Sequence, residues 1–288
     1  MNPTAPADSP SAGAGSNTHP LDQALHMVQQ PDGGMRAQAH PAYWNMVGPY
    51  GGITAAQMLQ AVLQHPDVLG DPISMTVNYA GPVQAGDFRI EAVPVRTNRS
   101  TQHWTVQIGQ CDAQGQFEIS TTATVITAVR RETFSVDDIP RPAMPAPESC
   151  ERYDTGKAMQ WLHRYDMRVV QGAIPKVWDG SEQESITQLW VRDDPPRPLD
   201  FPALAALCDV FYPRIWLRRA ERVPAGTVGM TVYFHADRAQ LARQGDKHLL
   251  AQASAQAFRN GYFDQTAQLW DSAGALLATS HQIVYYKA

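Results

Sequence analysis

Apolar and polar residues alternate along four stretches in the first half of the chain. Alternation places every second side chain on the same face of an extended strand, so each stretch predicts a half-buried strand of an antiparallel sheet. Asp112-Ala113-Gln114-Gly115 predicts a turn between the last two of these strands. The apolar positions are Ile73, Met75, Val77 and Tyr79; Phe88, Ile90 and Ala92; Trp104, Val106 and Ile108; and Phe117, Ile119, Ala123 and Val125.

The second half of the chain repeats this order of patterns. The stretch GMTVYFHA, residues 229–236, is similar to SMTVNYAG, residues 74–81, and begins 155 positions later. The turn Asp271-Ser272-Ala273-Gly274 follows the first DxxG turn by 159 positions and precedes a last strand from Leu276 to Tyr286. The alternating apolar positions before that turn are Val228, Met230, Val232 and Phe234, and then Leu249, Ala251, Ala253, Ala255 and Ala257.

Each copy also has an apolar segment with helical character ahead of its strands. GPYGG, residues 48–52, precedes ITAAQMLQAVLQH in the first copy, and Asp200 and Pro202 precede ALAALCDVF in the second. An Asp cap followed by a first-turn proline is typical of a helix N-terminus. Both segments are apolar nearly all round, which predicts buried helices. Two unrelated α+β domains with a chance octapeptide match are the alternative, but the shared order of helix, strands and turn favours a duplicated domain.

The composition divides the chain into four parts. Residues 1–19 are rich in Pro, Ala, Ser and Gly, which predicts a disordered tail, and they lack the basic and apolar regions of a secretory signal. Residues 20–134 and 158–288 are the two predicted domains. Residues 135–157 contain several prolines without periodicity, which predicts a linker.

Charge and cysteine content narrow the class of protein. The 288 residues carry a formal net charge of −5 without long runs of one sign, which gives no support for a nucleic-acid surface. No apolar run reaches about 18 residues, so no membrane span is expected. Cys111, Cys150 and Cys208 are too few and too far apart for a zinc site or a disulfide framework. A cytoplasmic location fits these features best.

The chain resembles the acyl-CoA thioesterase II type (TesB-like) family of double-hotdog proteins over roughly residues 20–288. The resemblance rests on GPYGG, SMTVNYAGPVQAGDF and Arg99-Ser100 in the first half, and on ALAALCD, Gly226-Thr227 leading into MTVYFH, and LWDSAGALLATSHQ in the second. It implies an α+β double hotdog, in which a curved antiparallel sheet wraps a long buried helix in each half. It also implies hydrolysis of an acyl-CoA substrate without a cofactor. Whether the double hotdog stands alone or forms homo-oligomers stays open.

The family holds its reactive water with an Asp, a Thr and a Gln, which by position are Asp209, Thr227 and Gln282. Asp209 stands in an otherwise apolar helical segment, where a carboxylate is costly unless it is paired; exposure at a frayed helix end is the alternative. Gln282 shares the inward parity of Ala278 and Val284. Thr227 has the opposite parity to its neighbours, but the glycines at 226 and 229 permit a bulge that would re-aim it.

Substrate contacts are expected in the first half. Gly51 and Gly52 precede the first helix, where free backbone N–H groups could stabilise an oxyanion; a tight turn without a ligand is the alternative. Tyr50, Trp44 and Met58 are candidates for lining an acyl tunnel, with core packing as the alternative. Ala123 aligns with Gln282, and the first helix has no acid, only Gln57, near the position of Asp209, so the first half is not expected to be catalytic.

Two other functions are compatible with this fold. A double hotdog could bind acyl-CoA without activity, or transfer the acyl group to an acceptor other than water in the same pocket. His235 and His281 are alternative bases, but both stand where an exposed position is commoner. Hotdog hydratases place a histidine shortly after the aspartate, and no histidine follows Asp209 in VFYPRIW.

Overall fold

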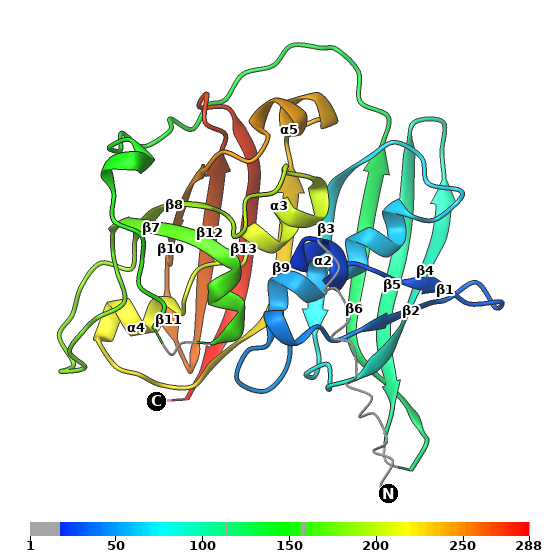
Figure 1. Ribbon diagram of the computed structural model, residues 1–288, viewed down its shortest axis with the longest axis horizontal. Helices are drawn as coiled ribbons and strands as arrows, with labels where there is room; N and C mark the ends of the chain where they lie inside the picture. Colours follow the sequence, from blue (N-terminus) through cyan, green and yellow to red (C-terminus); the bar gives the residue numbers. More distant parts are fainter. Residues whose placement is uncertain (1–17, 113, 157–158, 288) are drawn as a thin grey trace, which may run out of the picture.

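The computed structural model of the protein describes residues 18–112, 114–156 and 159–287. The predicted N-terminal tail therefore lies almost wholly outside the described residues. Thirteen strands form one continuous antiparallel sheet with the order β1-β2-β4-β5-β6-β3-β9-β13-β12-β10-β8-β7, and β11 pairs with β12 beside this path (Figure 1).

Each half contributes one side of the sheet and its own helices. The first half contains α1 (Pro20–Ala24), β1 (Val28–Gln29), β2 (Met35–Gln38), α2 (Gly51–Leu63), β3 (Asp71–Tyr79), β4 (Asp87–Thr97), β5 (Thr101–Cys111) and β6 (Phe117–Ala128). The second contains β7 (Tyr165–Gln171), β8 (Thr187–Asp193), α3 (Phe201–Leu207), α4 (Arg214–Arg219), β9 (Ala225–Phe234), α5 (Arg238–Gln244), β10 (Leu249–Ser254), β11 (Phe258–Arg259), β12 (Tyr262–Trp270) and β13 (Leu276–Tyr286).

The two similar octapeptides form the seam between the halves. Strands β3 and β9 pair in antiparallel fashion, with Thr76 opposite Thr231. The hydroxyls of these two threonines lie 3.0 Å apart. Because Thr231 is the counterpart of Thr76 in the repeat, a local twofold axis passes between them. The repeat thus supplies the self-complementary edge that a symmetric dimer would use, here within one chain.

A β-bulge recurs at equivalent positions of the two seam strands. In β9, Thr227 pairs with Val284 and Gly229 pairs with Ile283, which leaves Val228 as the extra residue. In β3 the register shifts in the same way at Ile73, 155 positions earlier. The bulge was therefore part of the duplicated unit.

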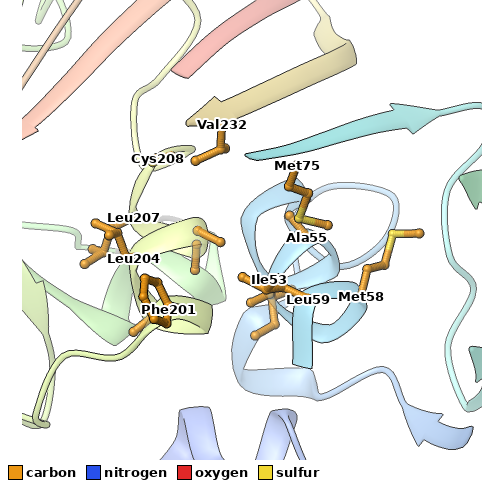
Figure 2. Close-up of a cluster of buried hydrophobic side chains, with 14 of the residues drawn as sticks. Ile53, Ala55, Met58, Leu59, Met75, Phe201, Leu204, Leu207, Cys208 and Val232 are labelled. Atoms are coloured by element: carbon orange, nitrogen blue, oxygen red, sulfur yellow. The ribbon is translucent and has the colours of Figure 1, made fainter. Parts of the chain in front are cut away.

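Helices α2 and α3 pack against each other on the concave side of the sheet. Figure 2 shows Ile53 and Leu59 of α2 beside the α3 side chains, with Met75 and Val232 pointing from the two seam strands towards the helices. All four side chains are at most 1% exposed. Burying a side chain of this size contributes about 1.5–3 kcal/mol, so this double layer is the main core of the molecule. The prediction of two buried helices wrapped by one sheet is confirmed.

The strand ladders change one expected correspondence between the halves. Met75 pairs with Val125, and its counterpart Met230 pairs with Gln282. The position equivalent to Gln282 is therefore Val125 and not Ala123, because the last hairpin is longer in the first half: Val125 follows the turn glycine Gly115 by ten residues, and Gln282 follows Gly274 by eight. Thr227 is equivalent to Pro72 by the same ladders.

Several local expectations were wrong. Phe117 and Ile119 are 45% and 46% exposed: a bulge between Ile119 and Thr121 shifts the register, and Glu118 between them is exposed as well, so this end of β6 extends beyond the core. Strand β10 ends at Ser254, so the alanines at 255 and 257 lie outside it. Helix α3 ends at Leu207, and Asp209 lies in the turn that follows it.

The predicted linker crosses from β6 to the second half over one end of the sheet (Figure 1). Apart from a short 3-10 turn, Pro147–Ser149, its described residues have no helix or strand. It is nonetheless anchored, because Trp190 donates a hydrogen bond of 2.9 Å to the Pro145 carbonyl and Arg168 donates one of 2.7 Å to the Pro147 carbonyl. These contacts cover the outer face of the second half.

Candidate active site

A cavity of about 460 Å³ lies between the two halves, at the N-terminal end of α2. The first half contributes the segment 45–51, Thr54 and the loop that follows β3. The second half contributes Asp209, the aromatic residues after it, and inward-facing side chains of β7, β9, β12 and β13. Neither half encloses this space alone.

Three polar side chains from the second half form a hydrogen-bonded chain in the cavity wall. The Thr227 hydroxyl donates to Oε1 of Gln282 at 3.2 Å. Nε2 of Gln282 donates to Oδ1 of Asp209 at 2.9 Å. The Gln282 amide is 3% exposed, so its partners hold it in one orientation and it holds the carboxylate in turn. The structure brings together the three residues that the family resemblance implies.

The Asp209 carboxylate lies against the first turn of α2, which belongs to the other half. The backbone N–H of Gly52 donates a hydrogen bond to it. A Cβ atom at Gly51 would lie 2.8 Å from Asp209 Oδ2 and 3.3 Å from the Tyr79 hydroxyl. No side chain of α2 caps its N-terminus, so the carboxylate from the second half takes the place of a cap, where the helix dipole favours negative charge.

Burial and hydrogen bonding act in opposite directions on this carboxylate. Burial raises the pKa of Asp209 from its ordinary value of 3.8 to about 7, while the hydrogen bonds from Gln282 and Gly52 lower it and limit the rise. Asp209 nevertheless reaches the cavity surface. A carboxylate that titrates near neutral pH and faces a cavity can accept a proton from a bound molecule.

The bulge in β9 explains how Thr227 enters the site. Val228 occupies the extra position and is 40% exposed. Thr227 consequently faces the same side as Met230, despite its opposite parity in the sequence. Gln282 alternates with the buried residues Ser280 and Val284 on β13, so its inward direction follows from regular strand geometry.

Comparisons with known proteins agree with this architecture. Residues 40–130 match the model of the acyl-CoA thioesterase N-terminal domain, and residues 139–286 match that of the acyl-CoA thioesterase C-terminal domain. The chain belongs to the acyl-CoA thioesterase family. A search of curated proteins found no match.

Solved structures place this thioesterase-family chain among double hotdogs. It is 45% identical, over 94% of its length and 99% of the other chain, to a conserved hotdog protein of unknown function from Alicyclobacillus acidocaldarius, with a TM-score of 0.87. A putative thioesterase II from Thermobifida fusca (20% identity, 93% and 97% coverage, TM-score 0.76) and an acyl-CoA thioesterase II from Mycobacterium marinum (19%, 93% and 98%, TM-score 0.73) share the fold.

The residues expected to contact substrate have different positions. Tyr50 and Gly51 are in the cavity wall, whereas Gly52, Trp44 and Met58 are not. The Gly52 N–H is taken by Asp209. Met58 lies within the core (Figure 2), because the cavity reaches only the first turn of α2 and Met58 is one turn beyond Thr54.

Trp44 and Tyr50 are both held by contacts with neighbouring residues. The Trp44 backbone pairs with Pro49 and accepts a hydrogen bond from the Trp161 N–H. The Tyr50 hydroxyl donates to the Ala206 carbonyl at 2.5 Å, and its ring stacks on Trp161 at a centroid distance of 4.5 Å. Tyr50 therefore fixes the start of α2 relative to α3.

Among the wall residues that sequence reasoning missed, Tyr79 and Gln265 lie beside the Asp209–Gln282 pair. The Tyr79 hydroxyl donates to the Gly51 carbonyl at 2.9 Å and lies close to the Asp209 carboxylate. Gln265 of β12 is paired across the ladder with Gln282. The inward parity of both residues was visible in the sequence, but their proximity to Asp209 depends on how the halves dock.

Other candidate groups lie away from the cavity or are inactivated by burial. The His235 and His281 rings are exposed and contact Thr279 and Asp264, respectively. Burial raises the pKa of the Cys208 thiol far above its ordinary value, which leaves the sulfur protonated. Within residues 18–287, apart from the three undescribed positions, no group of His, Cys, Asp and Glu is arranged to hold a metal ion. No helix in the described ranges is long and apolar enough to cross a membrane.

Proposed function

We propose that the protein hydrolyses an acyl-CoA thioester to a carboxylate and free CoA, with Asp209 as general base. The observation that carries the proposal is a half-buried carboxylate with a pKa of about 7 that faces a cavity and is held by Gln282. In its charged form Asp209 accepts a proton from water while the water oxygen attacks the thioester carbonyl carbon. A positioned base of this kind contributes about 10²–10⁴-fold.

The remaining steps use groups near the start of α2. The carbonyl oxygen becomes negative as the tetrahedral intermediate forms. Gly51 is the donor that fits this charge, since the Gly52 N–H is bound to Asp209 and the Gly51 N–H forms no hydrogen bond within the described part of the chain. When the carbon–sulfur bond breaks, the proton held by Asp209 passes to the CoA sulfur. The products are a fatty or related acid and CoA.

A thiol-release assay with acyl-CoAs of short, medium and long chains tests the proposal. Wild-type protein should release CoA from at least one of them, and Asp209→Asn should reduce the rate by about 10²-fold or more. Asp193→Asn is the matched control, because burial also raises the pKa of Asp193 to about 7 but Asp193 is not in the cavity wall. Its activity should stay close to that of the wild type.

Three results would contradict the proposal in different ways. Tight binding of acyl-CoA without thiol release, even with added nucleophiles, would indicate a binding module. Thiol release that requires an acceptor other than water would indicate an acyltransferase. Full activity in Asp209→Asn would remove Asp209 from the mechanism.

A further inference from the structure

Gln265 stands at an inward-facing position of β12, directly beside the proposed catalytic residues. It alternates with Phe263 and Ala267, which are buried, and its side chain is in the cavity wall. It is only 2% exposed. Gln282 is its cross-strand partner, so the Cβ atoms of the two glutamines are about 5 Å apart.

The Gln265 amide has no hydrogen-bond partner among the described residues, which sets it apart from the other buried glutamines. Gln57 donates to the Ala24 and Gln38 carbonyls. Gln102 donates to the Asp67 carbonyl and the Thr97 hydroxyl, and Gln244 donates to the Lys247 carbonyl. Gln282 bonds Thr227 and Asp209. Only at Gln265 does a buried amide face the cavity instead of a protein group.

An unpartnered buried amide restricts what can occupy the space in front of it. Leaving such a group without a hydrogen bond costs about 1–3 kcal/mol. A plain alkyl chain would displace water from the amide without forming a hydrogen bond to it. A hydroxyl or carbonyl oxygen could accept from the amide N–H₂, and a hydroxyl could also donate to its oxygen.

We propose that Gln265 selects acyl groups that carry a hydroxyl or oxo oxygen within the first few carbons from the thioester. The short distance to Gln282, which holds Asp209, sets this position along the acyl chain. Phe263, Met167 and Val169, which line the same cavity as Gln265, are apolar and suit a hydrocarbon remainder of the acyl chain. The inference rests on the proposed thioesterase function and names its substrate class.

The test compares octanoyl-CoA with octanoyl-CoA hydroxylated at carbon 2, 3 or 4. Both kcat/KM for thiol release and Kd by calorimetry are measured. Wild-type protein should prefer at least one hydroxylated ester over octanoyl-CoA by about tenfold or more. Gln265→Met, of similar volume and without the amide, should abolish this preference, because the hydroxylated ester loses its hydrogen bond and octanoyl-CoA no longer covers an unpartnered amide.

A matched control and a second variant guard against loss of folding. Gln268→Met makes the same change on the same strand, where Gln268 bonds Gln252 on the other face, and it should keep the preference. Gln265→Asn keeps a polar side chain but withdraws the amide by one methylene, and it should lose the preference as Gln265→Met does.

The outcomes separate this inference from the proposed function. Octanoyl-CoA used or bound as well as all three hydroxylated esters by the wild type would overturn the inference. A preference that survives in both Gln265 variants would also overturn it. If none of the esters releases thiol, the proposed function fails, and the preference in Kd still decides the role of Gln265.

Discussion

At the residue scale, the neighbours of Asp209 hold its pKa near neutrality at a cost to stability. The carboxyl titrates at about 7 in the folded chain, against an ordinary value of 3.8. Between these values the native state keeps a proton that the unfolded state has released, so this group makes stability fall as pH rises from about 4 to about 7. Above pH 7 the charged Asp209 carboxylate lowers the free energy of unfolding by its full amount.

Replacing Asp209 by Asn should therefore stabilise the protein while it removes activity. At pH 8 we expect a gain of about 1–2.5 kcal/mol in the free energy of unfolding, or about 5 °C in Tm at roughly 2–4 °C per kcal/mol, and the gain should shrink towards pH 5. Thermal unfolding of both proteins at the two pH values measures it. A lower Tm for the variant at pH 8 would contradict the account.

Asp264→Asn is a control for which the expected change in Tm at pH 8 has the opposite sign. Burial raises the pKa of Asp264, but hydrogen bonds from the Ala257 and Gln256 N–H groups and from His281 outweigh it, and the net pKa is lowered. A lowered pKa contributes stability that is present above the unfolded value and lost as pH falls through the folded one. At pH 8 the Asn variant at 264 should unfold at a lower temperature than the wild type.

At the element scale, the site depends on the first turn of α2. Gly51 and Gly52 leave room for the Asp209 carboxylate and for α3, since a Cβ at Gly52 would lie 2.6 Å from the Ala206 carbonyl oxygen. The sequence predicted this helix, the strands after it and the buried faces, because those follow from local periodicity. Its contact with Asp209 joins residues more than 150 positions apart and could not be predicted from periodicity.

Gly51→Ala should reduce thiol release by about 10²-fold, because a displacement of about 1 Å at a reacting group has an effect of that size. The new methyl group would press on Asp209 Oδ2 and on the Tyr79 ring. The measurement is kcat/KM together with Tm. Gly81→Ala is the matched control from the same cavity wall, since a Cβ there meets nothing within 4 Å. Equal activity in the two variants would show that the close approach at Gly51 is not needed.

The β-bulges are the places where the alternation of inward and outward residues along a strand fails to predict which side chains face inward. The glycines at 226 and 229 suggested the bulge that turns Thr227 inward, and the bulge is present. Nothing in the sequence around Ser120 suggested the bulge there, or that Phe117 and Ile119 would lie on an exposed end of β6. The strands ahead of each helix were also missed: β1 and β2 have only two and four residues, whereas β7 and β8 have seven each.

At the scale of the whole molecule, two copies of one domain have taken different roles. The seam and its bulges are retained in both. The positions equivalent to Gln282 and Thr227 carry Val125 and Pro72, which offer no hydrogen-bonding side chain. The first half instead supplies the helix N-terminus that holds Asp209. One chain therefore builds one site where a symmetric dimer would build two.

This asymmetry predicts the binding stoichiometry. A non-hydrolysable thioether analogue of an acyl-CoA should bind with one molecule per chain in isothermal titration calorimetry. Asp209→Asn should keep the same stoichiometry, because the cavity remains. Two equivalent molecules per chain would show that the first half retains a second site.

The central claim is that Asp209 must be charged to activate water, and the pH dependence of kcat/KM for thiol release tests it most directly. Because the pKa of Asp209 is about 7, the wild-type value should rise about tenfold per pH unit below 7 and level off above it. Asp209→Asn should lie about 10²–10⁴-fold lower without that inflection. A wild-type profile that is flat through pH 7, or an Asn variant with the wild-type profile, would contradict the account.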